Sequence, residues 1–188
     1  GARDVVISAA KTGLVFTLDR DTGEPVFPVE ERAVPQGGAE GEVLSPTQPF
    51  PSKPPPLAPT VVKQEDAWGL TPLDRGACRK TIAAARAEGL YTPPTEQGTI
   101  LYPFTGGGAN WGGGAFDPST NIYYVNTSSL MHLITLVPRA QTDNEWHSIP
   151  NGEHAPMRGA PYAMQRQTLV SPLGLPCNPP PWGELHAV

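Results

Sequence analysis

Short apolar runs separated by turn-forming residues are the main pattern of this 188-residue chain. The run Val5–Ala9 is followed by the turn Lys11-Thr12-Gly13 and by a second apolar run, 14–18. Another turn at 19–23 leads to Val26 and Phe27, which begin a third run. Turn signals every eight to ten residues or so predict a meander of short strands, as in β-sandwiches and β-propellers.

A second strand pair is predicted at 99–126, where two apolar runs flank the turn formers Asp117 to Asn121. Two triple-glycine runs, 106–108 and 112–114, precede this turn. Glycine costs conformational entropy, so six of them are expected only where backbone passes close to a flat or bulky group. From spacing alone, tight turns at the end of a sheet are favoured. A nucleotide-binding loop is disfavoured, because neither G-x-G-x-x-G nor Gly-Lys-Ser/Thr is present.

Proline and alanine mark the segment between these strand regions. Residues 28–59 are rich in proline and are interpreted as extended chain on the surface of a scaffold, or alternatively as a flexible linker. One helix is predicted over about 72–88, since Thr71 can cap it, Pro72 suits its first turn and Gly89 can end it. We expect this helix to be an insertion on a β scaffold.

The rest of the chain repeats the early pattern. An apolar run at 130–137 is followed by polar loop at 138–161 and by a second proline-rich approach at 172–182. The final run, 183–188, resembles 13–18 in its pattern and breaks off. Such recurrence predicts repeat units with long insertions, and a fragment of a longer repeat protein.

Composition narrows the class of protein. Glycine (20) and proline (24) make up about 23% of the residues, which indicates a turn-rich β protein. The net charge of −5 and the lack of a basic block argue against nucleic acid as a partner. No apolar run approaches the length of a membrane span.

Few side chains suggest chemistry by themselves. No metal-ligand spacing includes any of the four histidines, which are interpreted as ordinary surface or loop residues: His132, His147, His154 and His186. Cys78 and Cys177 are either one bridge or two buried thiols. No nucleophile elbow or paired carboxylates are evident. The residues alone therefore indicate a β-rich piece of a repeat architecture.

Several longer segments, in order along nearly the whole chain, resemble the pyrroloquinoline quinone (PQQ) dependent dehydrogenases, specifically the membrane-bound glucose dehydrogenase branch. These segments are 11–23 (KTGLVFTLDRDTG), 34–37 (VPQG), 44–50 (LSPTQPF), 91–99 (YTPPTEQGT), 111–113 (WGG) with Asp117-Pro118, 171–177 (SPLGLPC) and 181–183 (PWG). Together they are much more specific than any single motif. Both cysteines also match positions where that family has cysteine, so the resemblance favours a disulfide in an oxidising compartment.

The resemblance implies an all-β fold, a partial eight-bladed β-propeller of about two to three blades with long proline-rich insertions and one inserted helix. Blade strands are expected at 1–27 and 96–137, insertions at 28–95 and 138–182, and the start of the next blade at 183–188. The family's blade-docking motif fits Thr17, Asp19 and Gly23, but Phe27 stands at its tryptophan position. One blade-to-blade stacking contact should therefore be weaker than usual.

Two residues carry over to the cofactor. Lys11 matches the family's lysine that reaches the quinone oxygens, where a cation stabilises the negative charge that develops during reduction. Asn126 matches the asparagine that hydrogen-bonds the cofactor rim. Asn110 and Trp111, in the glycine-rich floor, are secondary candidates for contact with PQQ. From its sequence context alone, Lys11 would be interpreted as a solvated turn lysine.

The resemblance also implies partners outside these residues. The catalytic aspartate base, the ligands of a Ca2+ or Mg2+ ion and the tryptophan that stacks on PQQ would all precede Gly1, so the chain alone should be inactive. The implied reaction is periplasmic oxidation of a sugar or alcohol carbon, with the metal as Lewis acid and hydride passing to the quinone C5.

Glucose leads among the possible substrates, with polyols, quinate and other alcohols open. Ubiquinone or another acceptor would take the electrons, and a membrane anchor stays open. The chain would pair with the remaining blades or with itself, through its open strand edges. The alternative is a non-catalytic β-propeller module that serves as a binding scaffold.

Overall fold

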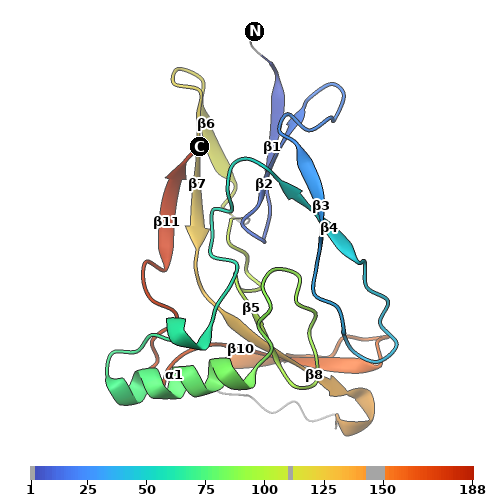
Figure 1. The fold of residues 1–188 in the computed structure, drawn as a ribbon, viewed down its shortest axis with the longest axis vertical. Coiled ribbons are helices and arrows are strands. Elements are labelled where there is room, and N and C mark those ends of the chain that lie inside the picture. Colours follow the sequence, from blue (N-terminus) through green and yellow to red (C-terminus); the bar gives the residue numbers. More distant parts are fainter. Residues whose placement is uncertain (1–2, 110–111, 143–150) are drawn as a thin grey trace.

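The computed structural model describes residues 3–109, 112–142 and 151–188, and strands dominate these ranges. Figure 1 shows the helix and the β8–β10 pair at one end of the molecule, and β1, β6, β7 and β11 toward the other. In chain order the elements are β1 (Val5–Ala9), β2 (Val15–Asp19), β3 (Val29–Ala33), β4 (Thr47–Pro51), the 3-10 turn η1 (Gln64–Asp66), α1 (Pro72–Ala84), β5 (Thr99–Leu101), β6 (Gly114–Asp117), β7 (Ile122–Ser128), β8 (His132–Pro138), the 3-10 turn η2 (Arg139–Gln141), β9 (Gly152–Ala155), β10 (Tyr162–Thr168) and β11 (Gly183–Ala187).

These strands form open antiparallel sheets. The hairpins β1–β2 and β3–β4 are two-stranded, whereas the larger sheets have the orders β5-β8-β10-β9 and β11-β7-β6. The predicted turn between β6 and β7 is confirmed: Asp117 accepts hydrogen bonds from the Ser119 N–H and from the Thr120 hydroxyl, and Asn121 takes a positive φ of 56°. An all-β architecture with one helix is therefore confirmed for the described residues.

The start of the helix is confirmed, but its predicted end at residue 88 is wrong. Thr71 caps α1 by accepting a hydrogen bond from the Asp74 N–H, and Pro72 occupies the first turn. The helix ends at Ala84 because the next residues pair with β5 instead. Arg86 donates its N–H to the Gly98 carbonyl and accepts from the Ile100 N–H, which forms a parallel bridge that a helix cannot contain.

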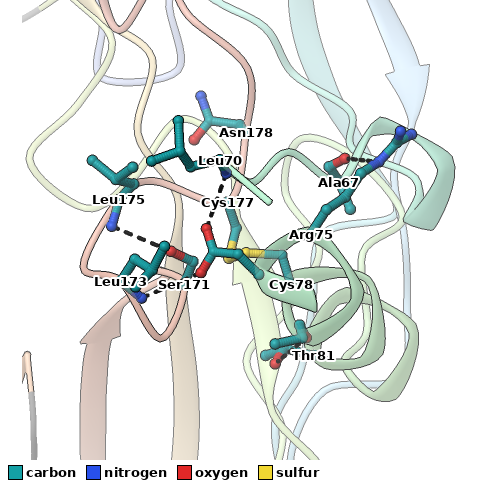
Figure 2. The surroundings of a disulfide bond; sticks show 12 residues. Ala67, Leu70, Arg75, Cys78, Thr81, Ser171, Leu173, Leu175, Cys177 and Asn178 are labelled. Atoms are coloured by element: carbon teal, nitrogen blue, oxygen red, sulfur yellow. Dashed lines mark hydrogen bonds between the residues drawn. A yellow bond between two sulfur atoms is a disulfide. The ribbon is translucent and has the colours of Figure 1, made fainter. Parts of the chain in front are cut away.

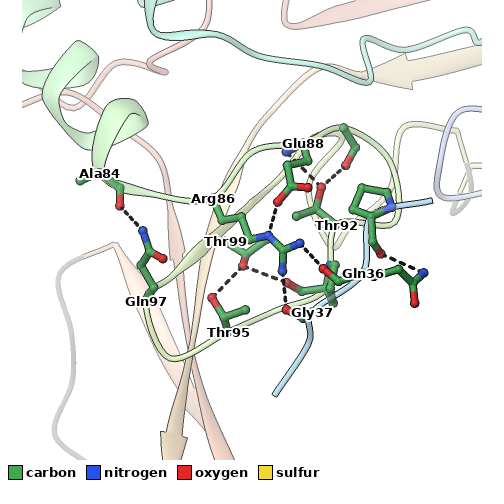
Figure 3. Close-up of polar contacts among 12 residues, drawn as sticks. Gln36, Gly37, Ala84, Arg86, Glu88, Thr92, Thr95, Gln97 and Thr99 are labelled. Carbon is green, nitrogen blue, oxygen red and sulfur yellow. Dashed lines mark hydrogen bonds and ion pairs between the residues drawn. The ribbon is translucent and has the colours of Figure 1, made fainter. Parts of the chain in front are cut away.

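The proline-rich segment contains the β3–β4 hairpin. Pro49 and Pro51 lie in β4, which has a neighbour on only one side, as their missing N–H groups require. The Arg86 guanidinium donates hydrogen bonds to the Gln36 and Gly37 carbonyls, which hold the chain after β3 in place (Figure 3). Arg86 also forms an ion pair with Glu88. This segment is therefore surface chain laid on the scaffold, and the flexible-linker interpretation is wrong for it.

One further expectation about strands needs correction. The predicted polar loop 138–161 contains β9, and β10, which follows this loop, is a central strand between β8 and β9. Its sequence, YAMQRQT, is too polar to show an apolar alternation, yet its backbone completes the sheet. Strand β11 lies in the run predicted at 183–188 and pairs with β7 at one edge of the β11-β7-β6 sheet.

A disulfide joins the helix to the second proline-rich segment, as the family resemblance favoured. The Cα atoms of Cys78 and Cys177 lie 5.3 Å apart, and both residues are 1% exposed (Figure 2). Around them lies the larger apolar core, whose other buried members are Val62, Ala67, Ile82, Ile100, Met131 and Leu169. Nearby, the buried carboxylate of Asp74 accepts from the Leu173 N–H, a second link between α1 and this segment.

Gly114 in the second glycine run is predicted to be intolerant of alanine. A Cβ there would lie 2.2 Å from the Tyr123 hydroxyl oxygen, and Tyr123 is buried against Ala109 and Val125. We expect Gly114→Ala to lower the free energy of unfolding of the intact protein by about 1–3 kcal/mol, the usual cost of overpacking. Urea denaturation followed by fluorescence measures this.

Gly76 in the helix provides the matched control. A Cβ at Gly76 meets nothing within 4 Å. Gly76→Ala should therefore raise the free energy of unfolding by up to about 1 kcal/mol, because alanine is the better helix former. Equal stability of the two alanine variants would contradict the assignment of Gly114 to a close approach.

Candidate functional site

Lys11 lies in the tight turn between β1 and β2, and its side chain is exposed. The turn is closed by hydrogen bonds from the Gly13 N–H to the Ala10 carbonyl (3.0 Å) and from the Ala10 N–H to the Leu14 carbonyl (2.9 Å). The Lys11 ammonium donates to the Thr105 carbonyl at 3.2 Å. A Cβ on Gly107 would lie 2.9 Å from Lys11 Cγ, so the first glycine run is needed for this approach.

Asn126 is the exposed residue of β7 between two buried ones, Val125 and Thr127. It is paired in register with Leu185 of β11. A Cβ on Gly112 would lie 2.7 Å from the Asn126 side-chain oxygen, so the second glycine run passes directly over this amide. The glycines therefore allow close approach on both sides, as their clustering predicts.

One residue, Gly108, connects the two regions. The Gly108 N–H donates to the Lys11 carbonyl at 2.7 Å, and the Gly108 carbonyl accepts from the Ser128 N–H at 2.8 Å. The turn that carries Lys11 is thereby tied to the end of the strand that carries Asn126. That their side chains face one common funnel stays a prediction. The secondary candidates Asn110 and Trp111 lie outside the described residues.

Lys11 also lines a small pocket. It has a volume of about 170 Å³, and aromatic side chains contribute to its wall from Tyr91, Tyr102 and Phe104. Burial raises the pKa of the Tyr91 and Tyr102 hydroxyls above their ordinary value, so both are neutral near pH 7. The wall of this pocket is therefore mainly apolar and aromatic, and Lys11 is the one residue in its lining that is ionised near pH 7.

A partly buried polar cluster adjoins Thr105. Its hydroxyl is 2.8 Å from His132 Nδ1 and accepts a hydrogen bond from the Arg166 guanidinium, also at 2.8 Å. Arg166 in turn forms an ion pair with Glu153. The His132 ring is 8% exposed and stands edge-on to Phe104, with 4.9 Å between the ring centroids. This cluster links β8, β9 and β10 to the loop that receives Lys11.

The interpretation of the histidines as ordinary surface or loop residues is wrong for His132, which is buried in β8. His154 and His186 are half-buried in β9 and β11, two strands at the edges of their sheets. His147 lies outside the described residues. The signal for His132 was present, because alternation along the apolar run 130–137 puts His132, Ile134 and Leu136 on one buried face.

Burial and the neighbouring Arg166 lower the pKa of His132 from its ordinary value of 6.5 to about 4. The unfolded chain therefore takes up a proton at this residue between about pH 6.5 and pH 4, while the folded chain does not. We expect the free energy of unfolding to be insensitive to this group above pH 7 and to fall as the pH is lowered through that window. Urea denaturation of wild type and His132→Asn at several pH values measures the effect.

The variant provides the comparison for this pH dependence. His132→Asn removes the titrating ring, so its profile should be flatter than that of the wild type between pH 6.5 and pH 4. Parallel profiles for the two proteins would contradict the buried, neutral state of His132.

The described ranges contain neither a group of metal-binding side chains nor a helix that could span a membrane. Over residues 3–109, 112–142 and 151–188, no three His, Cys, Asp or Glu side chains are grouped so that they could hold a metal ion. The helix found in those ranges is too short and too polar to span a membrane. The expected Ca2+ or Mg2+ ligands thus stay a prediction about other residues.

Successive open antiparallel sheets are the architecture expected of a partial β-propeller. The chain belongs to the PQQ-dependent family: the family model described as the glucose/ethanol/alcohol dehydrogenase β-propeller domain matches residues 1–188. The partial propeller fold is thereby confirmed. No solved structure shows a significant match.

Curated relatives agree with this family. The chain is 38% identical to quinoprotein glucose dehydrogenase of Escherichia coli (strain K12), over 98% of this chain and 24% of that protein. The chain is also 34% identical to quinate/shikimate dehydrogenase (quinone) of Acinetobacter baylyi, over 99% of this chain and 24% of that protein. It is 34% identical to the glycerol dehydrogenase large subunit of Gluconobacter thailandicus, over 97% of this chain and 27% of that protein. The chain thus spans about a quarter of the length of these relatives.

Proposed function

We propose that this chain forms the quinone-oxygen side of the cofactor site in a PQQ-dependent dehydrogenase that oxidises glucose or a related polyol or alcohol. The observation that supports this most is the pair of exposed donors, Lys11 and Asn126, each in close contact with the same glycine-rich segment. When bound, PQQ supplies a planar quinone that accepts two electrons from the substrate. An ammonium and an amide beside bare backbone suit a flat, anionic group of this kind.

Each of the two residues has a distinct role in this proposal. Lys11 places a positive charge where negative charge grows on a quinone oxygen, and such preorganised charge is a major source of catalysis. Asn126 donates its amide N–H to the cofactor rim and fixes the orientation of the ring. Asn110 and Trp111 are proposed to contribute to the floor. The catalytic base and the ligands of a Ca2+ or Mg2+ ion are proposed to come from other parts of the propeller.

The substrate and the acceptor belong to the same proposal. Two of the relatives named above are a glucose dehydrogenase and a glycerol dehydrogenase subunit, and a third is a quinate/shikimate dehydrogenase. We place glucose first because two relatives, the quinoprotein glucose dehydrogenases of Escherichia coli (strain K12) and Acinetobacter calcoaceticus, are each 38% identical to this chain. Ubiquinone or another quinone would take the electrons, in a periplasmic location.

Reconstitution of the intact protein, meaning the whole propeller that includes this chain, tests the proposal. The protein is depleted of cofactor with a chelator and then titrated with PQQ and Ca2+ or Mg2+, while reduction of an artificial dye is measured with glucose, glycerol or quinate as substrate. We expect saturable dye reduction with at least one of the three, strictly dependent on PQQ. Absence of PQQ binding by fluorescence quenching would instead favour a scaffold module that kept the propeller fold.

A further inference from the structure

We propose that Thr105 is a positioning residue for Lys11: the Arg166 and His132 side chains fix its hydroxyl, so that its carbonyl holds the Lys11 ammonium in place. This inference rests on the proposed function of Lys11 and deepens it. The first step is the hydrogen bond from Lys11 Nζ to the Thr105 carbonyl at 3.2 Å. Whatever fixes the Thr105 carbonyl therefore restricts the position of the ammonium.

The backbone around Thr105 is held at both ends. The Phe104 N–H donates to the Leu130 carbonyl at 2.9 Å, and the Gly107 N–H closes a turn onto the Phe104 carbonyl at 2.8 Å. Gly107 itself has a φ of 95°, which few other residues adopt without strain. Between these anchors, the hydrogen bonds of the Thr105 side chain add a third restraint on the residue that bears the carbonyl.

The hydrogen bonds of the Thr105 hydroxyl define its donor and acceptor roles. Arg166 can only donate, so the hydroxyl oxygen accepts from it, and the hydroxyl proton is then directed to His132 Nδ1. His132 is therefore the tautomer with its proton on Nε2, which lies 3.4 Å from the Thr168 hydroxyl. Every polar atom in this chain of contacts has a partner consistent with a neutral His132.

The cluster is attached to the two interior strands of the four-stranded sheet. His132 and Thr168 are paired in register between β8 and β10, in the interior of the four-stranded sheet. Glu153 of β9 balances the Arg166 charge, so Thr105 receives an oriented donor from a neutralised ion pair. Thr105 is thus bonded to the sheet through its hydroxyl and to the Lys11 ammonium through its carbonyl. Its contacts with the sheet therefore restrict where the ammonium can lie.

The test uses the intact protein without cofactor and measures Lys11 directly. Competitive acetylation with acetic anhydride, analysed by mass spectrometry, gives the reactivity of Lys11 relative to the exposed Lys53. Thr105→Val keeps the side-chain shape but removes the hydroxyl. We expect it to raise the relative reactivity of Lys11 by about two- to tenfold, the range that the loss of a net hydrogen bond implies. Thr105→Ser, which retains the hydroxyl, should restore the wild-type value.

A second threonine–histidine pair provides the matched control. The Thr127 hydroxyl lies 2.9 Å from His186 Nε2, in the β7–β11 pair. Thr127→Val should leave the relative reactivity of Lys11 unchanged. An unchanged Lys11 in Thr105→Val, or an equal change in Thr127→Val, would overturn the inference.

The same variants separate this inference from the proposed function. If the protein reduces dye with PQQ, Thr105→Val should lower kcat with little change in the KM of the substrate, since the misplaced charge matters most in the transition state. If no PQQ activity exists, the acetylation result still decides whether Thr105 restrains Lys11. A Thr105→Val enzyme with full kcat would count against the inference.

Discussion

Replacement of Lys11 with alanine should reduce the turnover of the PQQ-loaded protein by about 10- to 150-fold, the equivalent of a charge-assisted hydrogen bond of 1.5–3 kcal/mol. The exposed ammonium is held at the Thr105 carbonyl, beside a glycine that lets it approach without obstruction. The negative charge that it meets grows as the quinone is reduced. Loss of the Lys11 charge should therefore lower kcat more than it lowers the affinity for PQQ. Loss of a residue that only binds PQQ would lower the affinity alone.

Steady-state dye reduction and a PQQ titration by fluorescence quenching measure the two quantities separately. Lys11→Arg, which keeps the positive charge, should retain more turnover than Lys11→Ala. Lys53→Ala is the control, because Lys53 is an exposed lysine outside the proposed site. Equal turnover in Lys11→Ala and Lys53→Ala would remove the basis for a catalytic role at Lys11. A loss of PQQ affinity with the turnover of the loaded protein unchanged would show a binding role only.

Removal of the disulfide should lower the free energy of unfolding by about 2–5 kcal/mol, the usual cost for a native bridge that closes a long loop. Cys78 and Cys177 are 99 residues apart in sequence, so the bridge restricts more than half of the unfolded chain. The bridge also lies in the larger core, next to the Trp68 N–H that donates to the Cys177 carbonyl at 2.8 Å. Its loss should loosen the helix from the second proline-rich segment.

The double variant Cys78→Ala/Cys177→Ala tests this without leaving an unpaired thiol. Guanidinium unfolding of the intact protein can be followed by tryptophan fluorescence, because Trp68 and Trp182 stack edge-on near the bridge with 5.5 Å between their ring centroids. Dithiothreitol should shift the wild-type midpoint toward that of the variant and leave the variant unchanged. A wild-type midpoint insensitive to the reductant would contradict a stabilising bridge.

Local signals in the sequence predicted the elements that local interactions determine. The turn after Asp117 and the cap at Thr71 depend on side chains that bond to backbone within three residues. The end of α1 could not be predicted in this way, because it depends on pairing between Arg86 and β5. Strand β10 was missed for the same reason: its polar sequence is extended only because β8 and β9 supply its hydrogen bonds.

The residues of the candidate site also fall into those that the sequence predicted and those that only the structure shows. Lys11 and Asn126 were found through a family resemblance, and the glycine runs through their composition alone. Thr105 and Arg166 carried no motif, since their importance arises from a contact between residues 61 positions apart. His132 could have been recognised from the alternation along β8, but its partners could not.

The pairing of β7 with β11 has a consequence for the order in which the chain is made. Ser128 pairs with Gly183, so about 55 residues must be synthesised before the open edge of β7 meets its partner. At the usual 5–20 residues per second, this takes roughly 3–11 s. Cys177 is also made in this interval, so neither the bridge nor the completed sheet protects the nascent β6–β7 hairpin at first. An unpaired edge is a template for wrong partners, so the chain is open to misassembly during this interval.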